Sequence, residues 1–224
     1  MYRNIFITTL IGVAVLTAVV TTQATATDTA NPADDEQWHT MVQNETPKTA
    51  TFAGGCFWCI EGVYQGEKGI ASAVSGFTGG SEENASYNLV VTGKTDHREA
   101  VKLRYYPSLI SYKELLDMYW KSIDPTDAGG QFSDRGYHYT TAIYTHTDRQ
   151  YRLAKESKQN LSESGTFDEP IVTEILNAST FYRAADRHQN YSIRNQYQYE
   201  AYERASGRKG FLERTWENSP LTDK

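Results

Sequence analysis

Both cysteines of the chain lie three residues apart, within the motif Gly54-Gly55-Cys56-Phe57-Trp58-Cys59. A strand-like run at 49–53 precedes this motif and a helical pattern follows it, so we expect Cys56 at a helix N-terminus. Unpaired backbone N–H groups and the helix dipole favour the reactive thiolate at that position. The motif therefore predicts redox or nucleophilic sulfur chemistry, with Cys56 as the nucleophile. An inert disulfide is the alternative, although closing so short a loop removes little entropy from the unfolded chain.

This motif resembles the active-site signature of the A-class peptide methionine sulfoxide reductases, and further blocks of that family recur in the same order. The resemblance covers residues 49–199. The blocks are Gly76-Phe77-Thr78-Gly79-Gly80, Ser86-Tyr87, His97-Arg98-Glu99-Ala100-Val101, Asp124-Pro125-Thr126, Ser133-Asp134-Arg135-Gly136 with Tyr139, and Asp186-Arg187-His188-Gln189 with Tyr191.

The resemblance implies that Cys56 attacks the sulfoxide sulfur, that methionine is released, and that a sulfenic acid is left on Cys56. Glu99 matches the acidic residue of the family. A sulfoxide oxygen must be protonated before it can leave, and a carboxyl in apolar, aromatic surroundings keeps its proton near neutral pH. Without the resemblance, Glu99 would be interpreted as a solvated charge at a strand end.

Five further residues take their expected roles from the same resemblance. Tyr87 and Tyr139 match tyrosines that hydrogen-bond the sulfoxide oxygen, and Asp134 matches a carboxylate that organises the substrate and the sulfenic acid. Core tyrosines and a turn aspartate are the structural alternatives. Phe57 and Trp58 are expected to hold the terminal methyl group of the substrate and so to select the S-sulfoxide.

Histidine titrates near physiological pH, so His188 could act as a base. We expect a structural role instead, because the implied chemistry already has its acid. The remaining histidines lack the spacing of a zinc site, and two cysteines alone cannot complete one. We therefore expect no metal and no organic cofactor. These histidines are His39, His97, His138 and His146.

The chain departs from the family where many members carry a resolving cysteine. Glu200 stands at that place, and residues 201–216 are charged and helix-prone rather than glycine-rich. A second departure is Ala185, where the family often has a glutamate.

Cys59 is the only other thiol. Cβ atoms three residues apart in a regular helix are separated by about 5–6 Å, whereas a disulfide needs about 3.5–4.5 Å. Cys56 must therefore lie at the helix cap, or the first turn must loosen. We hypothesise that Cys59 resolves the sulfenic acid as a Cys56–Cys59 disulfide, which a thioredoxin-like partner reduces. Direct resolution of Cys56 by an external thiol is the competing hypothesis.

The elements that must position these residues are short strands interleaved with helices. Strand-like runs lie at 70–77, 99–106, 140–144 and 171–176, and two helices are expected after Ser111 and Thr147, with Glu114 and Gln150 completing their capping boxes. The lack of strict alternation predicts an α+β fold: a single domain, a two-layer α/β sandwich around a mixed or antiparallel sheet, with the nucleophilic cysteine at a helix N-terminus.

Composition narrows the class of protein. The chain has 224 residues, of which 39% are hydrophobic and 22% charged, as in soluble globular proteins. With a net charge of −6, the chain lacks the basic surface expected of a nucleic-acid binder. The same charge disfavours binding to anionic membrane surfaces. We expect a monomer that binds neither nucleic acid nor, after signal cleavage, a membrane.

Four segments are expected along the chain. Residues 1–26 have the three regions of a secretory signal peptide, ending at Ala24-Thr25-Ala26. The apolar run is shorter than the roughly 20 residues of a spanning helix, which disfavours a retained anchor. A flexible acidic leader (27–48), the catalytic domain (49–199) and a divergent tail (200–224) follow. Export predicts a periplasmic or secreted protein, whose cysteine pair needs a dedicated reductant.

The leading hypothesis is an exported enzyme that reduces methionine S-sulfoxide, free or in oxidised proteins, and so repairs oxidative damage. A thiol-disulfide oxidoreductase that uses Cys56 and Cys59 is the enzyme alternative, although such motifs usually place tryptophan before the first cysteine, whereas Trp58 lies between the two. A non-catalytic binding module with an aromatic pocket is the third possibility.

Overall fold

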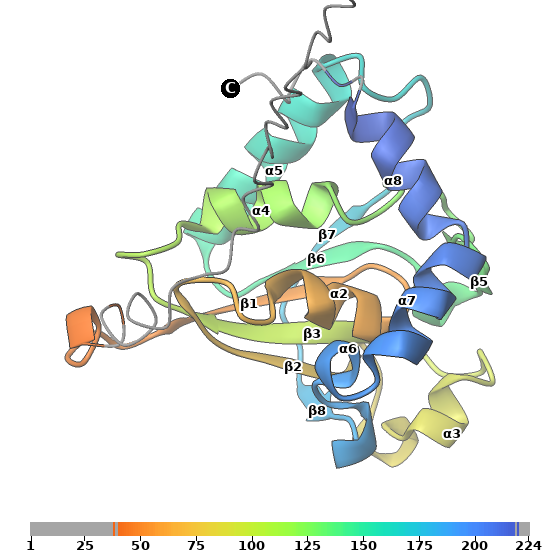
Figure 1. The fold of residues 1–224 in the computed structure, drawn as a ribbon, viewed down its shortest axis with the longest axis horizontal. Helices are drawn as coiled ribbons and strands as arrows, with labels where there is room; N and C mark the ends of the chain where they lie inside the picture. Colours follow the sequence, from red (N-terminus) through yellow and green to blue (C-terminus); the bar gives the residue numbers. More distant parts are fainter. Residues whose placement is uncertain (1–37, 39, 218, 220–224) are drawn as a thin grey trace, which may run out of the picture.

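The computed structural model describes residues 38, 40–217 and 219, and its centre is a six-stranded sheet of order β7-β6-β1-β3-β2-β8 (Figure 1). Neighbouring strands pair antiparallel except β6 and β7, which are parallel. A two-stranded sheet, β4-β5, stands apart. The strands are β1 (Lys48–Ala53), β2 (Ile70–Thr78), β3 (Arg98–Tyr105), β4 (Gly130–Gln131), β5 (Asp134–Arg135), β6 (Ala142–Thr145), β7 (Glu174–Asn177) and β8 (Phe181–Arg183).

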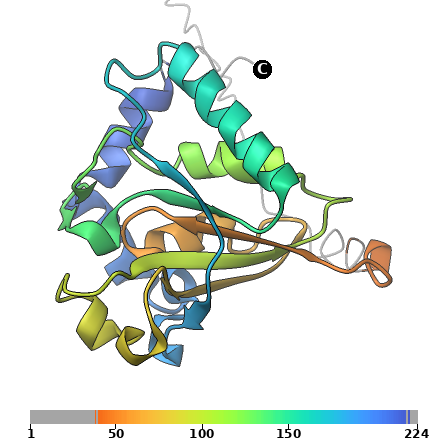
Figure 2. The same cartoon turned by 180° about the vertical axis from the view of Figure 1, so that it is seen from behind.

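Helices α2 and α4 pack on one face of the central strands, and the view from behind shows the segment that joins β7 to β8 crossing the other face (Figure 2). This mixed, mostly antiparallel sheet with a helical layer confirms the predicted α+β sandwich. The helices are α2 (Phe57–Tyr64), α3 (Tyr87–Val90), α4 (Tyr112–Trp120), α5 (Asp148–Glu163), α6 (Tyr191–Arg194), α7 (Gln196–Ala205) and α8 (Arg208–Glu217), and the 3₁₀ helices are Glu82–Asn84, Tyr137–Tyr139 and Asp186–His188.

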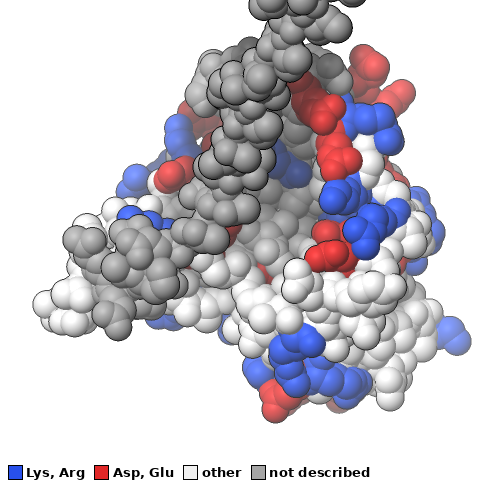
Figure 3. Space-filling model, viewed as in Figure 1, with Lys and Arg blue, Asp and Glu red and all other residues white. Residues whose placement is uncertain are grey.

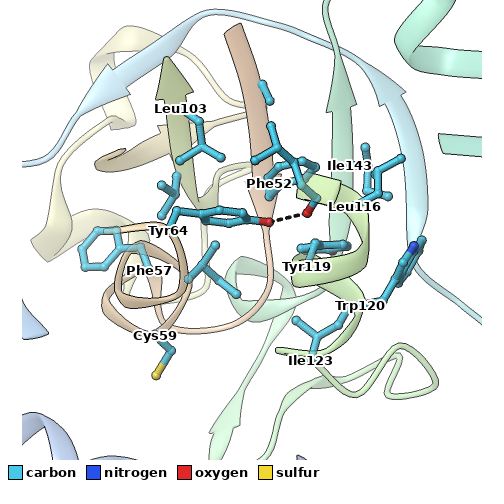
Figure 4. Packing of buried hydrophobic residues seen from close by; sticks show 14 of the residues in the cluster. Phe52, Phe57, Cys59, Tyr64, Leu103, Leu116, Tyr119, Trp120, Ile123 and Ile143 are labelled. Atoms are coloured by element: carbon cyan, nitrogen blue, oxygen red, sulfur yellow. Dashed lines mark hydrogen bonds between the residues drawn. The ribbon is translucent and has the colours of Figure 1, made fainter. Parts of the chain in front are cut away.

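Stacked aromatic rings join β1 to the helical layer (Figure 4). The Phe52 ring lies 5.7 Å from that of Tyr64 and 5.0 Å from that of Tyr119, centroid to centroid. Both phenols are buried but hydrogen-bonded, since Tyr64 donates to the Leu115 carbonyl at 2.9 Å and Tyr119 to the Ala53 carbonyl at 2.7 Å. The second bond fixes the point at which the chain leaves β1 and enters the cysteine motif.

The predicted helix caps are confirmed in one case and half confirmed in the other. Ser111 and Glu114 form both bonds of a capping box at the start of α4. At the start of α5, Thr147 accepts from the Gln150 backbone N–H at 3.2 Å. The Gln150 side chain instead accepts from the His146 N–H and donates to the Thr49 carbonyl, each at 2.7 Å. The predicted bond between the Gln150 side chain and the Thr147 backbone N–H is therefore wrong, because Gln150 joins the helix to β1.

The expected signal peptide (1–26) and most of the expected leader (27–48) lie outside the described residues. The described end of the leader packs on the domain, whereas the sequence predicts a flexible segment. Trp38 and Val42 are 6% and 3% exposed, and the Trp38 ring lies 6.3 Å from that of Tyr106. These two side chains supply apolar surface that the acidic composition of the segment obscured. Among the described helices, none combines the length and the apolar character that a membrane crossing needs.

Candidate active site

The turn before the nucleophile depends on Gly55, whose φ of +88° is unfavourable for other residues. A Cβ added there would lie 2.7 Å from both the Arg208 Nη2 atom and the Gln131 Cβ atom. Cys56 follows as the N-cap of α2, and its carbonyl accepts from the Cys59 N–H at 3.0 Å. The predicted placement of Cys56 at the cap is therefore confirmed.

The two thiols are free and buried, with Cys56 6% and Cys59 1% exposed, and the Cys59 sulfur points away from the apolar cluster (Figure 4). Burial raises the pKa of Cys56 well above its usual value, and its hydrogen bond to Cys59 raises it further. That hydrogen bond lowers the pKa of Cys59, burial opposes the effect, and the charge of Arg208 adds to it. Of the two thiols, Cys56 is thus the one that holds its proton more tightly. The prediction of a resting Cys56 thiolate was wrong, because burial outweighs the dipole of the short helix α2.

Glu99 lies on β3 beside the start of the cysteine helix and is 1% exposed. Its Oε2 atom accepts a hydrogen bond from the Phe57 N–H at 2.9 Å. Phe57 follows Cys56 in the chain, so the carboxyl lies next to the nucleophile. Burial raises the pKa of Glu99 to about 8, although the Phe57 N–H opposes this. The predicted neutral carboxyl near pH 7 is confirmed.

Three half-buried polar residues surround this acid. Tyr87 begins α3, Tyr139 ends the 3₁₀ helix Tyr137–Tyr139, and Asp134 lies in β5. Burial raises the pKa of both phenols, and the charge of Glu99 is the next largest contribution for each. Both therefore stay protonated and can donate hydrogen bonds at neutral pH. The charges of Asp134 and Cys56 also raise the pKa of both phenols, which means that these groups lie near one another. The structure thus brings the predicted polar residues together.

Aromatic rings form a wall beside the thiol. Phe57 is 1% exposed and packs with Tyr87 and His188, at 6.4 and 5.3 Å between ring centroids. Trp58 is partly exposed and stacks on Tyr191 at 3.8 Å. His188 is 4% exposed, and burial lowers its pKa. Its ring nitrogens have no hydrogen-bond partner among the described residues. A neutral imidazole within this wall fits the structural role that we expect for His188.

Two site residues that sequence reasoning missed come from the tail. Tyr202 of α7 donates a hydrogen bond to the Asp134 carboxylate. Arg208 begins α8, is 2% exposed, and donates to the Gly54 carbonyl at 3.0 Å. Figure 1 shows α7 and α8 following one another along one side of the molecule. The spacing of Tyr199 and Tyr202 indicates a shared helix face, but nothing in the sequence alone says what that face contacts.

Two of the histidines considered as metal ligands form hydrogen bonds to other groups. His97 accepts from the Gly80 N–H at 3.2 Å, and His146 lies 2.9 Å from the Thr51 hydroxyl. His39 lies outside the described residues. Within the described part of the chain, no three His, Cys, Asp or Glu residues are grouped as metal ligands would be.

Known proteins resemble this chain in sequence through its C-terminal helices. A sequence model of the family described as peptide methionine sulfoxide reductase matches residues 48–220, which include α7 and α8. A relative from Bacillus pumilus (strain SAFR-032), named peptide methionine sulfoxide reductase MsrA, is 50% identical over 173 residues, covering 77% of this chain and 97% of the relative. The protein of the same name from Bacillus subtilis (strain 168) is 49% identical, covering 77% and 98%.

Solved structures share the fold. Methionine sulfoxide reductase A of Corynebacterium diphtheriae is 29% identical, with a TM-score of 0.60 over 68% of this chain and 77% of that one. Mxr1 from Saccharomyces cerevisiae in its reduced form is 28% identical, with a TM-score of 0.64 over 68% and 88%.

Proposed function

The chain belongs to the peptide methionine sulfoxide reductase family, and on that premise we propose how its own residues reduce methionine sulfoxide to methionine. One observation carries the proposal. A carboxyl that holds its proton near neutral pH lies 2.9 Å from the backbone N–H of the residue next to Cys56. The site therefore pairs a sulfur nucleophile with a proton donor for the oxygen that must leave.

In the first half of the reaction, the Cys56 sulfur attacks the sulfoxide sulfur while Glu99 gives its proton to the oxygen. The oxygen passes to Cys56 as a sulfenic acid, methionine departs as a thioether, and the proton of the Cys56 thiol restores Glu99. Tyr87 and Tyr139 donate hydrogen bonds to the sulfoxide oxygen. These roles are supported by the protonated phenols beside the acid.

In the second half, the Cys59 sulfur attacks the Cys56 sulfenic acid, and the pair closes as a disulfide with loss of water. The side-chain hydrogen bond between the two thiols and the cap position of Cys56 support this step. A protein dithiol of the thioredoxin kind then reduces the disulfide, since the cycle needs two electrons for each sulfoxide.

Selection of the S-epimer follows from the aromatic wall in this proposal. Phe57 and the Trp58–Tyr191 stack surround the methyl group of the substrate, while the phenols and Glu99 bind its oxygen. Exchanging the oxygen and the lone pair on sulfur would turn the oxygen toward apolar rings, where it would lack a hydrogen bond.

The reaction is tested with the separated S- and R-sulfoxides of a methionine peptide and a small dithiol as reductant. We expect reduction of the S-epimer and no reduction of the R-epimer. Insulin incubated with the same reductant serves as the control for general disulfide exchange. Acceleration of insulin reduction above the rate with the dithiol alone, with no reduction of either sulfoxide, would refute the proposal and favour the thiol-disulfide oxidoreductase.

The role of Cys59 is tested with Cys59→Ser and a thioredoxin-type donor. We expect each enzyme molecule to release one methionine and then stall, while the unmodified protein turns over repeatedly. A small thiol added in excess should restart the variant, because the site that admits the sulfoxide also admits a small thiol. Unchanged multiple turnover with the protein donor would contradict internal resolution.

We also propose that the protein works outside the cytoplasm as a monomer, on free or protein-bound methionine sulfoxide. The signal-like pattern of residues 1–26 supports export. N-terminal sequencing of exported protein should find residue 27 first, and light scattering should give the mass of one chain. A start at Met1, or the mass of a dimer, would refute the corresponding part of this proposal.

A further inference from the structure

Arg208 is a buried cation whose described partners are neutral. Its guanidinium donates to the carbonyls of Gly54 and Ser122, and it lies over the Phe132 ring at 4.7 Å. Among the described residues, no carboxylate forms an ion pair with it. A buried charge without a counter-ion is costly, so a site that keeps one is suited to an anion that forms nearby.

The anion that can form next to this guanidinium is the Cys59 thiolate. The Arg208 guanidinium lies against the turn before Cys56. Its Nη2 atom is so close to Gly55 that a Cβ added there would lie 2.7 Å away. The positive charge of Arg208 lowers the pKa of Cys59, whereas the charges of Glu203 and Asp134 raise it. The other titratable groups that interact with Cys59 are Cys56, Glu99, Asp134, Tyr199, Tyr202 and Glu203.

We propose that Arg208 is a positioning residue for the second half of the reaction, in which its buried charge holds Cys59 as the thiolate that attacks the Cys56 sulfenic acid. This inference rests on the proposed resolution by Cys59. The S–S bond forms as the Cys56 S–O bond breaks, so the Cys56 sulfur is reduced and the Cys59 sulfur is oxidised. The departing hydroxide takes up a proton, which balances the proton that Cys59 gave to solvent, and leaves as water.

A purely structural role for Arg208 predicts a different result. Its bonds to Gly54 and Ser122 join the cysteine turn to the end of α4, and the loss of these bonds alone would slow both halves of the reaction by the same factor. The loss of charge affects the half that needs the Cys59 thiolate. Separate rates for the two halves therefore distinguish the two roles.

The test compares Arg208→Met with Lys209→Met in single turnovers of the full chain. Lys209 is the next residue of α8, with a side chain 53% exposed and paired with Glu213. Figure 3 shows acidic and basic side chains together over this helix, and Lys209→Met changes only such a surface charge. Methionine release is followed by rapid quench. The sulfenic acid is trapped with a cyclic 1,3-diketone, and the disulfide is counted by mass spectrometry.

For Arg208→Met we expect disulfide formation at neutral pH to slow about tenfold more than methionine release does, and its pH profile to move up by about one unit. Lys209→Met should match the unmodified protein in both halves. Arg208→Lys should restore most of the pH profile, because it keeps the charge. It also provides the test if the methionine variant fails to fold.

Equal slowing of both halves in Arg208→Met, or a pH profile in Arg208→Lys shifted as far as in Arg208→Met, would overturn the inference. With only the lysine variant folded, a shift of a full pH unit would overturn it. Cys59→Ser separates this failure from failure of the proposed function. If that variant loses its sulfenic acid as fast as the unmodified protein, internal resolution itself fails, whatever Arg208 does.

Discussion

The two cysteines lie one helical turn apart, but their electrostatic surroundings differ. On the β3 side, Cys56 lies beside Glu99, whose pKa burial raises to about 8, and beside two protonated phenols. On the side of the C-terminal helices, Cys59 interacts with the charge of Arg208. A neutral proton donor serves the step in which oxygen leaves the substrate, and a cation serves the step in which a thiolate is needed. In the proposed reaction, the two sides of one short helix thus carry different halves.

Removing the Cys56 sulfur gives the largest effect expected. Cys56→Ser should lose at least about a thousandfold in sulfoxide reduction, because an alcohol is a far weaker nucleophile than a thiol. The measurement is thioether formation from a methyl sulfoxide. Activity retained through Cys59 would show that either thiol can act as the nucleophile, and that the different surroundings of the two cysteines do not assign them to different steps.

Glu99→Gln tests the acidic side alone. We expect methionine release to slow by about a hundredfold to ten-thousandfold, the usual contribution of a general acid. In the unmodified protein, release should also fall as pH rises through about 8, because the carboxyl loses its proton. Single-turnover release across neutral and alkaline pH should show this fall in the unmodified protein and lack it in the variant. The same fall in both proteins would assign it to another group.

Glu99 should also make stability depend on pH. Its pKa is raised from 4.5 to about 8, so within this window the folded protein binds the proton more tightly than the unfolded chain does. Stability is then full below the lower value and falls as pH rises, by at most about 1.4 kcal/mol per pH unit. Denaturant titrations should show Glu99→Gln gaining stability relative to the unmodified protein over this range. The exposed residue Glu169 provides the control, and an equal gain for Glu169→Gln would contradict the assignment.

Tyr202→Phe gives the smallest expected effect. It tests whether the C-terminal helices contribute to the acidic side of the site, because Tyr202 links them to Asp134. Loss of one hydrogen bond to a carboxylate should reduce kcat/KM about tenfold. Tyr197→Phe is the matched control, since Tyr197 lies on the same helix and is 80% exposed. Equal losses for both variants would mean that the phenol on Asp134 does not contribute to the site.

Local patterns predicted much of this molecule. Strand periodicity, the Ser111 cap and the position of Cys56 depend on neighbouring residues, and all three are confirmed. The protonation of the cysteines was not predictable in this way, because it depends on burial by distant elements. The bond from Gln150 to β1 was not predictable either, since its partner Thr49 lies 101 residues away in the chain. Tyr202 and Arg208 escaped notice because helical, charged sequence indicates a surface, whereas one face of these helices closes the site.

The hydrogen bond from Arg208 to Gly54 joins residues 154 positions apart, and this separation determines when the site can be completed during synthesis. A growing chain emerges N-terminal end first, so the cysteine motif leaves the ribosome long before the guanidinium that supports it. Until α8 follows, the Gly54 carbonyl has no Arg208 to bind and the thiol pair lacks its neighbouring cation. Maturation of the catalytic turn is therefore a late event in the biogenesis of the enzyme.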